Sequence, residues 1–250
     1  MMMLRSILFV IYMYGMMAVV GLACLPLLIF PAKIMLGAIR FYVKCVRFGL
    51  RVICGIRTEI RGQQNMPEGA YIVAAKHQCM WDVFIPFLVC DAPTIIMKRE
   101  LLWYPILGWY ALRAGMIPID RAGTTKTLRQ MTRIAKERAA NQRQIVIFPE
   151  GTRIKPGAPT KYHSAGLASL YKALNVPIMP VATNAGLFWP AKGLRRNKGT
   201  IVYEILPPIP TGLARKKMMQ QVETEIEAHS AALLPASFLQ EKSYAQEGAT

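Results

Sequence analysis

A run of 27 residues without a charged side chain, between Arg5 and Lys33, limits what this chain can fold into more than any other feature. Met, Val, Leu and Ile dominate the run, which exceeds the roughly 20 apolar residues that a helix needs to cross a bilayer. Pro26 and Pro31 would break or end a single helix there. The sequence therefore predicts an N-terminal membrane-embedded segment, either one spanning helix or a helical hairpin.

The next stretch, 33–56, has the pattern of a basic amphipathic helix. Its basic residues recur at spacings of four, three and four, which places them on one helical stripe; they are Arg40, Lys44, Arg47 and Arg51. Apolar residues fill the other faces, as in helices that lie at a lipid interface; they are Ile39, Val43, Val46, Leu50 and Ile53. Because basic residues that follow an apolar segment favour the cytoplasmic side, we expect 1–57 to anchor a domain that faces the cytoplasm.

The formal net charge of +17 and the hydrophobic content of 53% narrow the class of partner. Together they favour an anionic membrane surface over nucleic acid. No zinc-finger spacing or RNA-binding aromatic run supports nucleic-acid recognition. Five cysteines without a CxxC pair predict reduced thiols, and three widely separated histidines predict no metal site.

From residue 58 onward, short apolar runs alternate with helical segments, which predicts an α/β domain over 58–234 and a flexible tail over 235–250. Seven strands are expected, at 58–61, 71–75, 94–97, 116–119, 145–148, 178–182 and 200–205. A helical pattern at 124–141 separates the fourth strand from the fifth, and such a crossover joins parallel strands. We therefore predict a mixed, partly parallel sheet with helices on both faces.

Polar residues directly follow three of the predicted strands. His77 and Asp82 come after the second strand, and the segments GMIPIDR (115–121) and FPEGTR (148–153) contain the ends of the fourth and fifth. Active groups in α/β sheets collect at the carboxyl ends of strands, so we expect these residues to meet.

His77 and Asp82 are five positions apart, which on one helix would point them about 140° apart. We therefore expect His77 in the loop and Asp82 in the first turn of the following helix. There, the carboxylate would hold one imidazole nitrogen and leave the other as a base for an alcohol. A helix-capping Asp beside a structural His remains the alternative.

Basic residues near these clusters predict a phosphate site. Arg121 and Arg153 offer guanidinium forks that match phosphate oxygens, and Lys98 adds a cation after the third strand. Gly151 allows close backbone approach, and Thr152 carries a hydroxyl donor.

Four blocks resemble, in order and spacing, those of the glycerolipid acyltransferase family, and most closely its bacterial 1-acyl-sn-glycerol-3-phosphate acyltransferases. The blocks are His77-x4-Asp82, GMIPIDR, FPEGTR and VPIMPVA (176–182), and the resemblance covers about 58–210. It implies that His77 is the general base and that Asp82 orients it. It also implies phosphate and acceptor contacts from Lys98, Arg121, Glu150, Gly151, Thr152 and Arg153, and an acyl-donor region at Val176, Pro177, Ile178 and Pro180.

The resemblance predicts transfer of an acyl chain from acyl-CoA or acyl carrier protein to the sn-2 hydroxyl of lysophosphatidic acid. This reaction gives phosphatidic acid for phospholipid biosynthesis and needs no cofactor. An N-terminal pair of helices half-sunk in the bilayer and a place at the bacterial inner membrane are implied as well. Another lyso-lipid, such as a lyso-ornithine lipid, or glycerol 3-phosphate stays open as the acceptor.

Two further interpretations remain. Cys79 stands where many family members have a small polar residue, and its thiol could act as a nucleophile beside His77. Alternatively, the chain is no enzyme but a basic, membrane-tethered binding module for acidic lipids or partner proteins.

Overall fold

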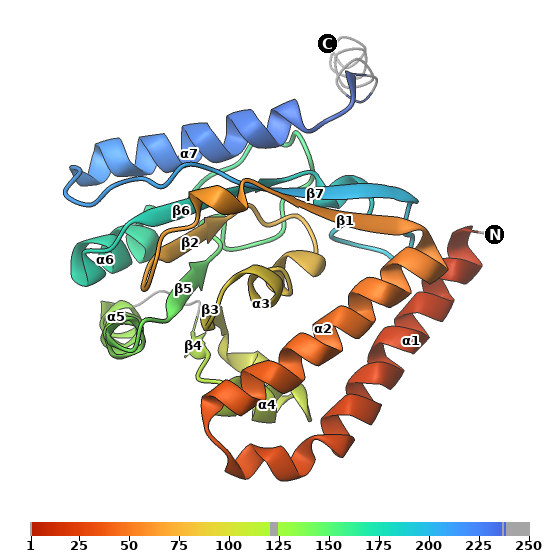
Figure 1. Cartoon of the computed structure of the whole chain (residues 1–250). Helices are drawn as coiled ribbons and strands as arrows, with labels where there is room; N and C mark the ends of the chain where they lie inside the picture. The colour runs from red at the N-terminus through yellow and green to blue at the C-terminus, as the bar shows by residue number, and fades with distance from the viewer. Residues whose placement is uncertain (1, 121–124, 237, 239–250) are drawn as a thin grey trace.

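A seven-stranded sheet forms the centre of the protein in a computed structural model that describes residues 2–120, 125–236 and 238 (Figure 1). The strands are β1 (Ile56–Arg61), β2 (Ile72–Ala75), β3 (Pro93–Lys98), β4 (Ile117–Ile119), β5 (Gln144–Ile147), β6 (Ile178–Thr183) and β7 (Gly199–Ile205). Each predicted strand is present, with ends displaced by one or two residues. Most of the predicted tail, 235–250, lies outside the described residues.

The strand order is β1-β7-β6-β2-β5-β3-β4. Neighbouring strands are parallel except β6 and β7, which are antiparallel. The predicted helix at 124–141 corresponds to α5 (Thr125–Ala140), which joins β4 to β5 across β3. The prediction of a mixed, partly parallel sheet is thus confirmed.

Helices cover both faces of the sheet (Figure 1). One face carries α5, α6 (Ser164–Leu174) and α7 (Arg215–Ala232), and the other carries α1 (Met2–Ala23), α2 (Ala32–Cys54), α3 (Pro86–Val89) and α4 (Leu107–Arg113). Side chains alternate along each strand between the two layers, as the pleat requires. In β2, Ile72 and Ala74 pack toward α5–α7, whereas Val73 and Ala75 pack toward the N-terminal helices.

Short 3-10 turns connect several of these elements. They are η1 (Leu25–Ile29), η2 (Gln63–Asn65), η3 (Trp81–Val83), η4 (Arg99–Trp103) and η5 (Ala185–Leu187). Two of them matter below: η1 forms the turn between α1 and α2, and η3 carries Asp82.

The helices α1 and α2 form an antiparallel hairpin with η1 at its tip (Figure 1). Within the described part of the chain, α1 is the one helix long and apolar enough to cross a membrane. Only 28% of its most apolar window is buried, so most of its apolar side chains face outward, as Leu4, Leu8 and Ile11 do. A helix of this kind indicates association with a membrane.

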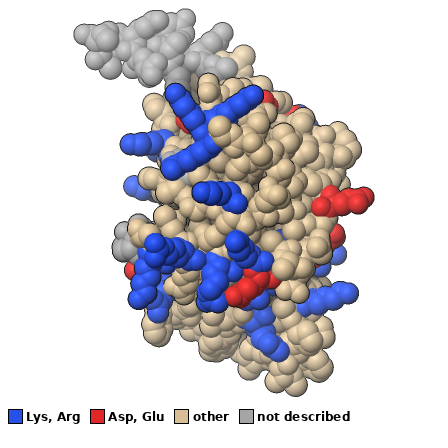
Figure 2. All heavy atoms as spheres, turned by 90° about the vertical axis from the view of Figure 1, so that its left-hand side faces the viewer, with Lys and Arg blue, Asp and Glu red and all other residues tan. Residues whose placement is uncertain are grey.

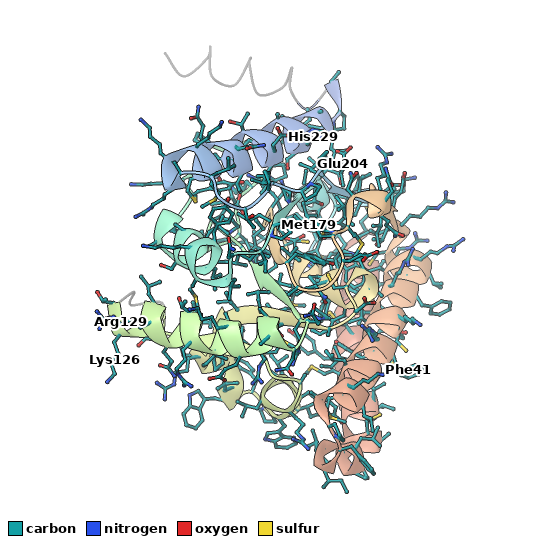
Figure 3. The ribbon with its side chains drawn as sticks, turned by 60° about the vertical axis from the view of Figure 1, so that its left-hand side comes forward. Phe41, Lys126, Arg129, Met179, Glu204 and His229 are labelled. Atoms are coloured by element: carbon teal, nitrogen blue, oxygen red, sulfur yellow. The ribbon has the colours of Figure 1, made fainter. Side chains whose placement is uncertain are left out.

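The structure shows which side of the predicted helix at 33–56 the protein itself covers. Val43, Val46 and Leu50 are fully buried in the core that α2 shares with α1 and the sheet. The reason is that two paired helices must each bury one face before the remaining face can meet lipid. The outward side of α2 instead carries apolar residues such as Phe41 (Figure 3).

Part of the basic stripe of α2 also has partners within the protein. Arg40 donates hydrogen bonds to the carbonyl oxygens of Phe87, Cys90 and Asp91, at the C-terminal end of α3. A cation there satisfies carbonyl groups that the short helix leaves without partners. Arg40 therefore ties the hairpin to the domain.

Candidate active site

The predicted His–Asp pair is formed. His77 lies in the loop two residues beyond β2, Asp82 lies in η3, and the imidazole Nδ1 is 3.1 Å from the Asp82 Oδ2. An ionised carboxylate only accepts hydrogen bonds, so Nδ1 carries the proton. The other ring nitrogen, Nε2, is then left with its lone pair and can accept a proton.

The Asp82 carboxylate accepts hydrogen bonds from its own loop and from the distant strand β7. Its Oδ2 also accepts the backbone N–H groups of Gln78 and Cys79, at 2.6 and 2.7 Å. Its Oδ1 accepts the hydroxyl of Tyr203 in β7 at 2.6 Å. Burial raises the pKa of Tyr203 well above its ordinary range, so the hydroxyl stays a donor. These contacts fix the carboxylate, and through it the imidazole ring.

Glu150 fixes the backbone of the same loop from the other side. Its Oε2 accepts the backbone N–H of His77 at 2.6 Å, and its Oε1 lies 2.7 Å from the ammonium group of Lys76. Burial raises the pKa of Glu150, and Lys76 acts to lower it. Lys76 also binds Glu227 of α7 at 2.5 Å, and Tyr162 donates to the same Glu227 oxygen. The buried cluster thus connects α7 to the loop of His77.

The resemblance assigns Glu150 to the acceptor, but the structure directs both of its carboxylate oxygens to groups of the protein itself. Its side chain is fully buried and does not border the cavity described next. The geometry therefore gives Glu150 a positioning role, and its predicted contact with the acceptor stays a prediction.

An apolar cavity of about 300 Å³ opens beside His77 and extends between the α1–α2 hairpin, β3 and α4. His77 borders the cavity, and its ring stacks on Phe148 with 4.3 Å between ring centroids. The only charged side chains on its wall are Lys98 and Arg153, within the described residues. Such a cavity suits a long hydrocarbon chain whose polar end lies near the imidazole and two cations.

The structure brings some predicted phosphate-binding residues to His77 and not others. Lys98 ends β3, pairs with Glu100 at 2.9 Å and stays half-exposed, and Arg153 is exposed at the same rim. Thr152 is exposed beside Arg153 but does not border the cavity. Arg121 lies outside the described residues.

Gly151 has a conformational reason to be glycine. Its φ is 67°, in the left-handed region that side chains disfavour, and an added Cβ would stand 3.0 Å from the His163 ring. Its backbone N–H closes a turn onto the carbonyl of Phe148 at 3.0 Å. This turn sends the chain from β5 to Arg153 at the rim, while the predicted acceptor contact of Gly151 stays a prediction.

The block at Val176, Pro177, Ile178 and Pro180 lies in and before β6, beside β2. Ile178 stands opposite Ile72 and Pro180 opposite Ala74, and the carbonyl of Pro177 accepts the N–H of Ile72. None of the four residues borders the cavity of His77. They support the strand that ends at the histidine, and their assignment to the acyl donor stays a prediction.

Cys79 has the surroundings of a buried thiol. It is fully buried, and its Sγ lies 3.4 Å from the Asp82 Oδ1. Burial, and next the charge of Asp82, raises the pKa of Cys79 well above its ordinary value. Because the thiolate is the nucleophile and Cys79 does not border the cavity, this geometry argues against nucleophilic catalysis. Among the described residues, no group of three His, Cys, Asp or Glu side chains could hold a metal ion.

Sequence reasoning missed Tyr203, Lys76 and Glu227. Tyr203 lies 121 residues from Asp82, and Glu227 lies 151 residues from Lys76. A signal existed for Tyr203, since alternation in β7 points it inward and a buried tyrosine hydroxyl needs a partner. The signal for Lys76 was weaker: a lysine that directly follows a buried strand suggests a buried charge that needs an acidic partner.

Comparison with known proteins identifies the family to which the chain belongs. The sequence model of a family described as "Acyltransferase" matches residues 57–184, just over half of the chain. A 1-acyl-sn-glycerol-3-phosphate acyltransferase of Pseudomonas aeruginosa is 37% identical over 157 residues, covering 63% of this chain and 61% of that protein. The alpha form from Homo sapiens is 32% identical over 165 residues, covering 65% and 58%. The matches therefore span about three fifths of these relatives' own length.

A solved structure shares the fold. The crystal structure of the 1-acyl-sn-glycerophosphate (LPA) acyltransferase of Thermotoga maritima aligns with a TM-score of 0.77 at 23% identity. The alignment covers 93% of this chain and 98% of that one. The common architecture therefore includes the N-terminal hairpin as well as the sheet.

Proposed function

The chain belongs to the acyltransferase family, and from this premise we propose that it acylates the sn-2 hydroxyl of lysophosphatidic acid, giving phosphatidic acid. The acyl donor is a thioester, acyl-CoA or acyl carrier protein, and no cofactor takes part. The names of the relatives support the acceptor. The observation that carries the proposal is the His77 ring, held by Asp82 at one nitrogen and bordering an apolar cavity.

In the proposed reaction, the Nε2 of His77 removes the proton of the acceptor hydroxyl while its oxygen attacks the thioester carbonyl carbon. The tetrahedral intermediate collapses, the carbon–sulfur bond breaks, and the thiolate takes the proton from the imidazolium. Asp82 stabilises the charged ring between these two steps, because its carboxylate accepts a hydrogen bond from the Nδ1–H group. A general base of this kind accounts for about 10²–10⁴-fold of the rate.

The rim and wall of the cavity support a substrate with a phosphate and a long chain. Lys98 and Arg153 border the cavity next to His77, and each can bind phosphate oxygens. The apolar wall removes hydrocarbon from water and stabilises a bound chain by about 0.8 kcal/mol for each buried methylene. An amphiphile held this way presents its hydroxyl to the imidazole.

The outward apolar side of α1 supports a site of action at a membrane. We assign the protein to the bacterial inner membrane, with the hairpin in the bilayer and the α/β domain on the cytoplasmic side. This placement gives the cavity access to lysophosphatidic acid in the bilayer and to the thioester donor in the cytoplasm.

The experiment uses the purified, detergent-solubilised full chain and a matrix of donors and acceptors. Oleoyl-CoA and oleoyl-acyl carrier protein are each combined with lysophosphatidic acid, a lyso-ornithine lipid and glycerol 3-phosphate, and products are measured by mass spectrometry. Phosphatidic acid as the main product supports the proposal. Product from another acceptor alone corrects the substrate, and no product from any pair leaves the tethered binding module as the better account.

A further inference from the structure

A patch of large apolar side chains lies on the surface of η4 and α4. These elements are separate in the sequence from the α1–α2 hairpin. Trp103 is 84% exposed, Tyr104 60% and Leu112 57%, and Trp109 and Leu107 are also exposed. Exposed apolar residues that occur singly are ordinary, but five large ones within ten positions of the chain call for a partner. We refer to these five residues as the 103–112 patch.

The patch is held in place by residues on the inner side of α4. Tyr110 is buried and donates its hydroxyl to the carbonyl of Gly21 in α1 at 2.8 Å. Arg113 donates to the carbonyls of Leu28 and Ile29 in η1, at 2.6 and 2.8 Å. Because the helix is bound to the hairpin on this side, Trp109 and Leu112 face outward.

A tight turn separates η4 from α4 and adds to this arrangement. Ile106 has φ 64° and ψ −64°, and the N–H of Leu107 donates to the carbonyl of Pro105 at 2.7 Å, which is the geometry of a γ-turn. A β-branched residue rarely adopts a positive φ, so the surroundings must hold it there. The Ile106 side chain lies against Gly21, where an added Cβ would be 2.3 Å from its Cγ2.

The patch continues the apolar surface of the hairpin. At the tip, Ile29 is 79% exposed and Phe30 is also exposed, and Arg113 joins this tip to α4. Figure 1 shows α4 beside the end of the hairpin where η1 turns. The apolar surface therefore runs from α1 across η1 to the 103–112 patch.

The basic residues beside the patch indicate that its partner is an anionic surface. Lys98, Arg99 and Arg113 flank it, with Glu100 as the one acidic residue between 92 and 119. Figure 2 shows Lys and Arg side chains spread over the upper and lower parts of one face of the molecule, with fewer Asp and Glu side chains among them. Trp and Tyr bordered by basic residues are the composition that lies at the headgroup level of a bilayer, where the rings enter the apolar boundary and the cations meet lipid phosphates.

We propose that the 103–112 patch is a second membrane contact, which inserts Trp103, Trp109 and Leu112 into the bilayer surface beside the mouth of the cavity. Leu101, Ile106 and Leu107 border the cavity from the same segment. A lipid chain can thus pass from the bilayer into the cavity along η4 and α4 without crossing water. This last step rests on the proposed function, because it assumes a lipid substrate.

Tryptophan fluorescence tests the contact directly, since the four tryptophans divide into two buried and two patch residues. Trp81 and Trp189 are buried, whereas Trp103 and Trp109 belong to the patch. The full chain is bound to phosphatidylglycerol vesicles whose acyl chains are brominated near the headgroup. The patch signal is the difference between the wild type and Trp103→Phe/Trp109→Phe.

We expect the brominated lipid to quench this difference signal at least twofold, and acrylamide in the aqueous phase to quench it less on vesicles than in dilute detergent. Equal acrylamide quenching in both states, with no effect of bromine, would overturn the proposal. The readout needs no turnover. Quenching without phosphatidic acid formation would therefore count against the proposed function alone, and turnover without quenching against the patch alone.

A second measurement uses Trp103→Gln/Leu112→Gln, with Leu194→Gln as the matched control. Leu194 is 47% exposed and lies near the opposite end of α1, where the N–H of Arg196 binds Ser6. For long-chain substrate in vesicles, we expect the patch variant to raise KM about tenfold and the control to leave it unchanged. For a short-chain, water-soluble lysophosphatidate, both should match the wild type. An equal loss on both substrates would contradict a membrane role.

Discussion

Replacement of Lys76 by Met removes the cation from the buried cluster behind the catalytic loop. The Lys76 and Glu150 side chains are 3% and 0% exposed, and their charged atoms lie 2.7 Å apart. Removing one partner of such a pair leaves the other charge buried without compensation, at a cost of about 3–5 kcal/mol. Lys76 also pairs with Glu227, which is only half-buried. In the variant, water can screen the charge of Glu227, so the loss of this second pair costs little. We therefore expect the lower end, about 3 kcal/mol.

The loss should depend on pH in a direction that the cluster fixes. Burial already raises the pKa of Glu150 above its ordinary 4.5, and Lys76 acts to lower it, so Lys76→Met raises this pKa further. A carboxyl group with a higher pKa in the folded than in the unfolded protein binds more protons when folded. The free-energy deficit of the variant is therefore largest well above the folded-state pKa, and it shrinks as pH falls through that pKa toward 4.5.

Urea and thermal unfolding in detergent, followed by circular dichroism at several pH values, measure the effect. A loss of 3 kcal/mol corresponds to a Tm lower by roughly 6–12 °C for a chain of this length. Lys172→Met, on the exposed side of α6, is the matched control and should change little. Lys76→Met/Glu150→Gln should recover part of the loss. A deficit equal to that of the control, or one independent of pH, would refute the reasoning.

Three other substitutions test particular contacts. Tyr203→Phe removes the hydroxyl from the Asp82 Oδ1, so it should cost about 1–3 kcal/mol in unfolding experiments and lower kcat/KM about tenfold; unchanged values would show that this hydrogen bond is dispensable. Cys79→Ala should keep activity within about threefold and cost about 1 kcal/mol of stability; loss of activity in the folded variant would restore the nucleophile hypothesis. Gly21→Val should force Ile106 into the cavity, lower stability by about 1–3 kcal/mol and slow the longest acyl chains most, which a donor chain-length series measures.

Most strands were predictable because they are short runs of largely buried apolar residues, whereas β1 has only its first residue buried and alternates partly buried with exposed residues along the rest. The prediction that His77 and Asp82 meet also succeeded, since it needed only the end of β2 and a short turn. The sequence pattern of α2 left open which of its sides the protein covers. An amphipathic pattern shows that one side of a helix avoids water, but it does not say whether lipid or protein covers that side, and Val46 is covered by protein.

The supporting groups of the site could not be predicted from local pattern. The resemblance alone assigned Glu150 to the acceptor, and nothing in the local sequence showed that its carboxylate would bind Lys76 and the backbone of His77. Tyr203 and Glu227 reach the site from β7 and α7, more than a hundred residues away. Such contacts depend on how the sheet is ordered, and a single sequence does not encode strand order locally.

The central claim is that His77 acts as the base of an acyl transfer. The most direct test is the initial rate of phosphatidic acid formation from oleoyl-CoA and lysophosphatidic acid by the wild type and by His77→Ala, purified side by side. The account predicts a rate at least about 10²-fold lower for the variant, with an unchanged unfolding transition. A folded His77→Ala protein that works within tenfold of the wild type would contradict it.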